Sequence, residues 1–275
     1  MTSPSLPVNR RHSLEEQAYL ALRKALVQGV FPPGQKLSIR RIAAEMKTSP
    51  MPVRTALRRL ATEQALEVLP SGTAIVPQMT RTAFRELSAI RASLEPLAVE
   101  LAGANWNSAI HQKLTGILKL EQNARAAGDA EQFLNFDREF LFTIYEAARA
   151  PLLYGMIEAT WLRRGPLFWD ARWLLVSRAP GSARHADLLS ALNDVDLARA
   201  CSLLKAEIEG STAFLLERMQ FADDPPDQLR LAPIRTGSLN EPAAASRSRG
   251  RKKSDSSKAG RKPPVSRASG KLIQA

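Results

Sequence analysis

The sequence predicts a mainly α-helical protein with an N-terminal winged helix-turn-helix, an all-α antiparallel helical bundle and a disordered basic tail. Two short amphipathic helices and a β-hairpin pattern come first, and about six amphipathic helices joined by short loops follow. The C-terminal segment is rich in Ser, Pro, Gly, Lys and Arg, so it cannot bury enough apolar surface to fold. We expect the three parts at 12–78, 79–222 and 223–275.

The first predicted helix begins at a capping box, in which Ser13 is followed three residues later by Glu16. Apolar residues then recur at helical spacing to about Gln28. Gly29 is typical of the position after a helix end, because glycine readily adopts a left-handed backbone conformation.

The stretch from Ser38 to Leu60, SIRRIAAEMKTSPMPVRTALRRL, is typical of two short helices joined by a tight turn. Ser38 and Ser49 are good N-caps, and Pro50 lies at the first position of the second helix, where a missing N–H costs nothing. The polar face of this helix carries Arg54, Thr55, Arg58 and Arg59. A basic helix face suits the DNA major groove, although a helical hairpin with solvated arginines would show the same pattern.

Two β-prone runs, 65–69 and 73–76, follow this stretch, and 70–72 reads as the hairpin turn between them. Helix, turn, helix and β-hairpin is the order of elements in a winged helix-turn-helix. The tip of the wing would bring Ser71 and the Gly72 backbone close to a phosphate or the minor groove. This order favours nucleic acid over an anionic membrane as the partner.

Two segments of this region resemble the GntR family of bacterial transcription regulators: GVFPPGQKL at 29–37 and SPMPVRTALRRL at 49–60. The resemblance spans roughly 13–78 and implies binding to a double-stranded DNA operator. Pro50 stands where the family usually has Arg, and Thr55 where it has Glu. From the resemblance and the basic helix faces, the predicted DNA-binding residues are Arg40, Arg41, Ser49, Pro50, Arg54, Arg58, Ser71 and Gly72.

The segment 80–222 shows no strand pattern and reads as six helices with their own core. Short loops between them favour an antiparallel bundle. Pro166 should kink or break the fourth helix. The predicted helices are 80–103, 108–127, 130–148, 151–176, 182–193 and 194–221.

The formal net charge of +12 is concentrated at the two ends of the chain. Residues 1–78 carry net +6, 79–239 net −2 and 240–275 net +8, so both ends are expected to meet a polyanion, with the tail as a non-specific DNA tether. Cys201 is the single cysteine, which excludes an intramolecular disulfide and a thiolate zinc cluster. No apolar run suits a signal peptide or a membrane span, so we expect a cytoplasmic, nucleoid-associated protein without a membrane partner.

Polar side chains fall on or beside the apolar stripes of the predicted bundle, where an unpaired charge would be costly. They are Arg91, Asp137, His185 and Glu207. We therefore expect Asp137, His185 and Glu207 to converge. The alternative without a metal ion is a buried pair of Asp137 with His185, or of Asp137 with Arg91.

The bundle also resembles the FCD ligand-binding domain of the FadR-type GntR branch, in IRASLE at 90–95, DREF at 137–140, ARAPLL at 148–153 and HADLLSAL at 185–192. Many such domains hold a divalent ion such as zinc, nickel or manganese with one Asp and three His, and this ion helps to bind a small carboxylic acid. Asp137 and His185 match two of these ligands, whereas Leu141 and Glu207 stand where the other two histidines are expected. The resemblance thus implies Asp137, His185 and Glu207 as metal ligands, and Arg91 with these three as effector-binding residues.

Together these observations predict a homodimeric transcription regulator, not an enzyme, whose operator affinity is controlled by a small organic acid effector. Two other functions fit parts of the pattern. One is a metal-dependent hydrolase using Asp137, His185 and Glu207, but the sequence shows no nucleophile–base pair. The other is an architectural DNA-binding protein without an effector. The pattern leaves repression and activation open.

Overall fold

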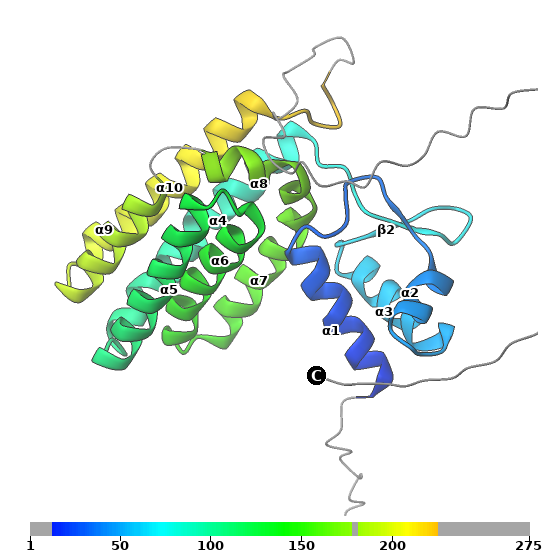
Figure 1. The fold of residues 1–275 in the computed structure, drawn as a ribbon, viewed down its shortest axis with the longest axis horizontal. Coiled ribbons are helices and arrows are strands. Elements are labelled where there is room, and N and C mark those ends of the chain that lie inside the picture. Colours follow the sequence, from blue (N-terminus) through cyan, green and yellow to red (C-terminus); the bar gives the residue numbers. More distant parts are fainter. Residues whose placement is uncertain (1–12, 178–180, 225–275) are drawn as a thin grey trace, which may run out of the picture. The chain divides into compact units, whose positions relative to one another are not determined.

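A computed structural model describes residues 13–177 and 181–224, with the side chains of 181–183 left out (Figure 1). The mainly α-helical fold class predicted from the sequence is confirmed. The predicted disordered tail lies outside the described residues except for Asp223 and Asp224. None of the described helices is long and apolar enough to cross a membrane.

The N-terminal part consists of three helices and a three-stranded sheet. In order they are α1 (Leu14–Val27), β1 (Lys36–Leu37), α2 (Ile39–Glu45), α3 (Pro50–Thr62), β2 (Glu67–Val68) and β3 (Ala74–Ile75). All pairs are antiparallel, in the order β1-β3-β2, with Ile75 opposite both Lys36 and Glu67. The predicted wing is therefore present as β2 and β3, and β1 adds a third strand to it.

Local hydrogen bonds explain where these helices begin. The Ser13 hydroxyl accepts from the Glu16 N–H at 3.2 Å, and the Ser38 hydroxyl accepts from the Arg41 N–H at 3.4 Å. Ser49 precedes α3 as predicted, but its side chain makes no capping hydrogen bond, and Pro50 fixes the first turn instead. Buried apolar residues of α1, α2, α3 and the sheet form one cluster beneath these elements.

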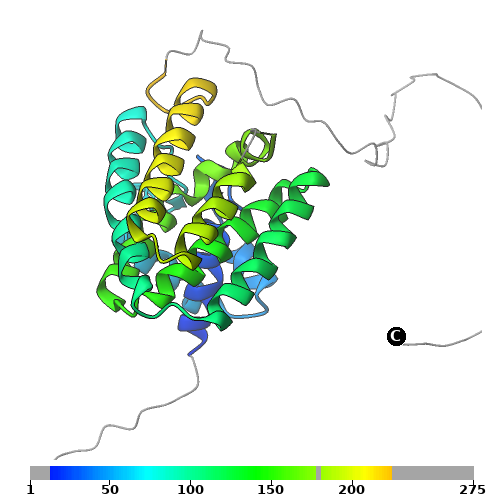
Figure 2. The same ribbon diagram turned by 90° about the vertical axis from the view of Figure 1, so that its left-hand side faces the viewer.

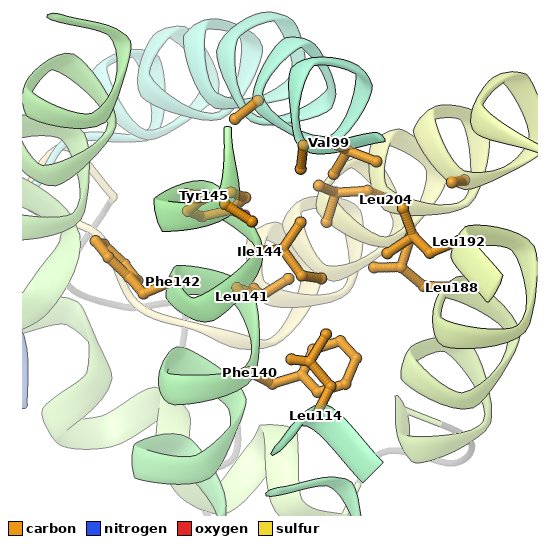
Figure 3. Packing of buried hydrophobic residues seen from close by; sticks show 14 of the residues in the cluster. Val99, Leu114, Phe140, Leu141, Phe142, Ile144, Tyr145, Leu188, Leu192 and Leu204 are labelled. Carbon is orange, nitrogen blue, oxygen red and sulfur yellow. The ribbon is translucent and has the colours of Figure 1, made fainter. Parts of the chain in front are cut away.

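The C-terminal part is a bundle of helices lying side by side (Figures 1 and 2). Its elements are α4 (Arg81–Gly103), α5 (Ser108–Ala126), α6 (Ala130–Ala147), α7 (Pro151–Arg164), the 3-10 helix η1 (Gly165–Leu167), α8 (Phe168–Ser177), α9 (Gly181–Asn193) and α10 (Leu197–Arg218). Its core comes from α4, α5, α6, α7, α9 and α10, and includes Leu114, Phe140, Ile144, Leu188 and Leu204 (Figure 3).

Two predicted helices of the bundle differ from the observed ones. The predicted helix 151–176 is divided into α7, η1 and α8, because Pro166 interrupts it as expected. The predicted helix 194–221 begins only at Leu197. Val195 has φ +58°, which ends the preceding helix, and the Asp196 carboxylate accepts from the Arg199 N–H at 3.0 Å to start the next.

The end of the bundle extends past the predicted boundary at residue 222. The Asp223 carboxylate accepts from the Arg81 N–H at 2.8 Å, and the Asp224 carboxylate pairs with the Arg81 guanidinium. These contacts fix the described C-terminal residues on the first turn of α4.

The C-terminal end of α7 belongs to the bundle but also contacts the N-terminal part. Leu162 is 2% exposed and belongs to the apolar cluster of the N-terminal part. The backbone of Gly165 lies so close to α1 that a Cβ there would be 2.1 Å from the Leu26 carbonyl oxygen. Arg163 donates a hydrogen bond to the Gln64 side chain after α3. One turn of helix thus joins the two parts.

Candidate nucleic-acid interface and ligand cavity

A concave surface of about 870 Å³ lies between α2, α3 and the wing. It is lined by the side chains of four cations, Lys36, Arg40, Arg54 and Arg58, and no acidic residue of the described part of the chain lines it. Six of the eight residues predicted to bind DNA meet here. They are Arg40, Pro50, Arg54, Arg58, Ser71 and Gly72. A concavity lined by guanidinium groups and free of carboxylates is suited to a polyanion.

The other two predicted residues do not line this surface. The Arg41 guanidinium lies 3.6 Å from the Glu45 carboxylate, and both side chains are exposed. Ser49 precedes the first turn of α3 without lining the concavity. Of the two adjacent arginines of α2, Arg40 therefore lines the basic surface, whereas Arg41 pairs with Glu45 on the same helix.

The tip of the wing has the geometry of a tight turn. Gly72 has φ +79°, a left-handed conformation that favours glycine, and its N–H donates to the Leu69 carbonyl at 2.8 Å. A Cβ on Gly72 would meet no atom within 4 Å, so its backbone is open to an approaching ligand. The Ser71 hydroxyl bonds to the Thr73 hydroxyl at 3.0 Å.

A second cavity, of about 60 Å³, lies in the bundle among α4, α5, α6, α7, α8, α9 and α10. All four predicted effector-binding residues line it: Arg91, Asp137, His185 and Glu207. Three further charged residues that the sequence analysis did not single out also line it: Glu121, Arg125 and Arg164. Charged groups from separate helices therefore converge in the interior of the bundle.

His185 is the centre of a buried polar cluster. Its Nδ1 lies 2.7 Å from the Glu121 carboxylate, its Nε2 lies 3.7 Å from the Asp137 carboxylate, and its ring stacks on Phe140. Burial lowers the pKa of His185, but Glu121 and Asp137 outweigh burial and raise that pKa to about 9. Burial raises the pKa of Asp137 to about 6, against the attraction of His185. The predicted pair of Asp137 with His185 is thus part of a three-residue cluster.

The remaining predicted residues are paired with neighbours. Arg91 donates to both oxygens of Glu95, from Nε at 2.6 Å and from Nη2 at 3.1 Å. Glu95 is fully buried and also accepts from the Tyr145 hydroxyl at 2.6 Å and from Trp161 Nε1 at 2.9 Å. Glu207 is paired with the Arg184 guanidinium. Arg91 therefore bonds to Glu95 and not to Asp137, because Glu95 lies one turn away on the same helix.

Comparison with known proteins identifies the family. The model of the gntR family of bacterial regulatory proteins matches residues 14–76, and the FCD domain model matches residues 86–210. The HTH-type transcriptional regulator McbR of Escherichia coli K12 is 36% identical over 154 residues, which are 56% of this chain and 70% of McbR. The chain belongs to the GntR family. It is a transcriptional regulator with an FCD domain, and its relatives are regulators, not enzymes.

Solved structures of GntR-family proteins share the fold. The E. coli McbR/YncC structure matches with a TM-score of 0.69 and 31% identity, over 74% of this chain and 98% of that one. A candidate GntR transcriptional regulator from Rhodococcus sp. RHA1 matches with a TM-score of 0.64 and 22% identity, over 75% of this chain and 99% of that one. The second likeness supports the fold alone.

One imidazole and two carboxylates in the cavity could hold a divalent ion, with fewer protein ligands than the one Asp and three His expected from the resemblance. Glu121, Asp137 and His185 each offer one ligand atom, and these atoms lie within 4.8 Å of one another. Glu121 already bonds to Nδ1, the arrangement in which a carboxylate orients a metal-binding imidazole. Nε2 of His185 and the Asp137 carboxylate would then hold the ion. Glu207 lines the same cavity but lies outside this cluster.

Glu121 could have been found by the signal that identified Asp137. On α5 it lies in the buried stripe of Leu114, Ile117, Leu118 and Ala124, and it is 1% exposed. A carboxylate at such a position requires a partner. Arg164 gave the same signal, because on α7 it lies in the buried stripe of Ile157, Thr160 and Trp161.

Proposed function

We propose that this GntR-family regulator binds a DNA operator through the basic concavity, and that a small carboxylic acid in the bundle cavity changes its operator affinity. The observation that carries the proposal is the concavity itself, which combines Lys36, Arg40, Arg54 and Arg58 with a protruding wing and has no lining acid. Arginine guanidinium groups contact guanine edges and phosphates in DNA complexes. A concave surface lined by three arginines and one lysine therefore suits DNA. Action on the chromosome would place the protein in the cytoplasm with the nucleoid.

The proposed unit is a homodimer joined through the bundle. The outer face of α4 exposes three large apolar side chains at helical spacing, Ile90 (41% exposed), Leu97 (44%) and Leu101 (41%). A stripe of this kind on a helix otherwise packed in a core favours burial against a second copy. Two N-terminal parts, divided from the bundle near residue 78, would then read two half-sites of a near-palindromic operator.

Within the cavity, His185 Nε2 and Asp137 are the proposed holders of a divalent ion such as zinc, nickel or manganese. A bound ion would supply a Lewis-acidic anchor for an anionic ligand. Glu121 holds the imidazole in place through Nδ1 whether or not an ion is bound. Glu207 and Arg184 would close the side of the cavity formed by α9 and α10.

The turn at the end of α7 offers a path from the cavity to the DNA-binding part. Arg164 lines the cavity, whereas the residues on either side of it, Arg163 and Gly165, contact the N-terminal part. A displacement of this turn on effector binding would move the basic concavities of a dimer relative to each other. Couplings of this kind are typically about 1–3 kcal/mol.

Selection of binding sites from a random DNA library by the full-length protein tests the proposal. We expect enrichment of a sequence with two related half-sites, and loss of that enrichment in Arg54→Ala. Failure of the wild type to enrich any sequence contradicts operator binding. The selected sequence then serves to test whether small acids change the affinity.

A further inference from the structure

Two arginines that line the cavity, Arg125 and Arg164, have a buried Nε–H without a hydrogen-bond partner among the described residues, and the more deeply buried of them is Arg164. It is 8% exposed, it lines the cavity, and its buried Nε–H has no hydrogen-bond partner among the described residues. Its guanidinium lies over the ring of Trp161, 3.6 Å from the centroid, and 4.4 Å from that of Phe168. The aromatic faces hold the guanidinium in position but leave its donors without acceptors.

Most other charged groups of the cavity form a hydrogen bond within the protein, whereas Arg164 is attracted by Glu95 and Asp137 without a hydrogen bond to either. Arg91 is bonded to Glu95, Glu121 to His185, and Glu207 to Arg184. Arg125 donates to the Val176 carbonyl at 3.1 Å. Since Arg91, Glu121 and Glu207 are already hydrogen-bonded within the protein and Arg125 donates to a backbone carbonyl, a ligand entering the cavity would find on Arg164 a guanidinium held only by aromatic rings.

A buried cation without a hydrogen-bonded anion beside it is unfavourable for folding. Burial and the nearby Arg91 lower the pKa of Arg164 to about 9, against the attraction of Glu95 and Asp137. A chain that retains such a group in its core retains a strained binding site for an anion. Mutation to an apolar residue of similar length would relieve that strain.

Both the chemistry and the size of the cavity restrict the anion. A guanidinium fork binds a carboxylate through two parallel hydrogen bonds, the geometry that favours arginine over lysine at such sites. A volume of about 60 Å³ accommodates roughly five water-sized groups. A second carboxylate on the ligand would meet Asp137, Glu121 and Glu207, which line the same cavity.

We propose that Arg164 binds the carboxylate of the effector, and that the effector is a monocarboxylic acid with few non-hydrogen atoms. This inference rests on the proposed function in placing the effector in this cavity. In this proposal the carboxylate of the effector contacts Arg164 and not Arg91. The ligand's remaining atoms would lie toward Asp137 and His185, with or without an ion between them.

The test uses the full-length protein in a buffer free of other carboxylates. The probes are acetate, propionate, pyruvate and lactate, together with the matching uncharged amides. Thermal unfolding and tryptophan fluorescence report binding, since Arg164 lies against Trp161. The variants are Arg164→Met and Arg164→Lys, with Arg163→Met as the matched control, because Arg163 is on the same turn but contacts Gln64 outside the cavity.

We expect at least one acid, and none of the amides, to raise the unfolding temperature of the wild type and of Arg163→Met in a saturable way. Arg164→Met should unfold at a higher temperature than the wild type without ligand and show no shift with any acid. Arg164→Lys, which keeps the charge but loses the fork, should bind about tenfold more weakly or worse. It also serves as the test if Arg164→Met does not fold.

Three results would overturn the inference: equal binding of an acid to the wild type and Arg164→Met, equal binding of acids and amides, or no binding of any acid to the wild type. Operator affinity is measured on the same preparations. Acid binding through Arg164 without an effect on operator affinity would refute effector control and leave the Arg164 site in place. Operator binding without acid binding would refute the Arg164 site alone.

Discussion

Nδ1 of His185 lies 2.7 Å from a carboxylate oxygen of Glu121, and both side chains are almost completely buried. The pair joins α9 to α5 in the interior of the bundle. A buried charged pair of this kind is sensitive to the protonation of its members, so it makes the stability of the bundle depend on pH.

The free energy of unfolding should fall as pH rises from about 6.5 to about 9. The pKa of His185 is raised from 6.5 to about 9 in the folded protein, so its stabilisation is complete below 6.5 and is lost as pH rises through 9. The expected loss is roughly 1–3 kcal/mol. Urea unfolding in the presence of a chelator measures it, and Glu121→Gln should show a flatter dependence. The pKa of Asp137 is raised to about 6, so titration of Asp137 affects the free energy of unfolding below pH 6.5 and not in this range. A wild type with constant stability from pH 6.5 to 9 would refute the charged pair.

Arg54→Ala should weaken specific operator binding by about 1–3 kcal/mol if Arg54 meets a base edge. The side chain lines the basic concavity, in contrast to that of Arg41, which pairs with Glu45. Arg41→Ala is therefore the matched control and should leave the affinity almost unchanged. Fluorescence anisotropy with the selected operator measures both. Equal losses in the two variants would argue against a special role of the concavity.

Gly165→Ala should destabilise the protein by about 1–3 kcal/mol or more, because the added Cβ would lie 2.1 Å from the Leu26 carbonyl oxygen. Gly155→Ala on the same stretch of helix is the control, since a Cβ there meets nothing within 4 Å. The control should be stabilised by roughly 0.5–1 kcal/mol, as expected for glycine replaced in a helix. Calorimetry compares the two, and a Gly165→Ala protein as stable as the wild type would show that the junction is looser than described.

Glu95→Ala should destabilise the bundle by about 3–5 kcal/mol. The substitution leaves Arg91, Tyr145 and Trp161 without their shared acceptor in the core. Chemical denaturation gives the change, and the combined substitution of Glu95 and Arg91 by apolar residues should recover part of it. No recovery in the double variant would indicate that the lost volume, not the orphaned charge, dominates.

A divalent ion bound at the proposed site should be lost in His185→Ala and in Asp137→Asn and retained in Glu207→Gln. The reason is the geometry of the cluster, in which Nε2 of His185 faces Asp137 at 3.7 Å, whereas Glu207 is paired with Arg184. Elemental analysis of protein purified without chelator, repeated after addition of zinc, gives the content. Equal metal in the wild type and in His185→Ala would exclude this cluster as the site.

The family and the fold class were predictable because local signals and packing agree along most of the chain. Caps such as Ser13 and Ser38 and the break at Pro166 fixed the helices to within a few residues. Strand β1 has only two residues, so it has no periodicity to detect. It exists because β3 offers it a free edge, which is a tertiary effect.

The cavity was predictable in part. The signal of a charged group on an apolar stripe pointed to Asp137 and His185, which meet as expected, and the same signal was present at Glu121. The pair of Arg91 with Glu95 follows the local spacing of one helical turn, whereas the pair of Glu207 with Arg184 depends on how α9 packs against α10. Arg164 continues the buried stripe of Ile157 and Trp161 on α7, but the prediction of one helix over 151–176 did not show that the buried face ends there.

The burial of Leu162 among residues of α1 and α3 affects how regulators of this kind can be recombined. A chimera that exchanges the sensory half at residue 78 removes a side chain from the core of the half that is kept. Loss of a buried leucine typically costs about 2–5 kcal/mol, enough to unfold a small domain. A chimera that joins this DNA-binding part to another ligand-binding domain therefore needs a leucine at the position of Leu162 in the helix that replaces α7.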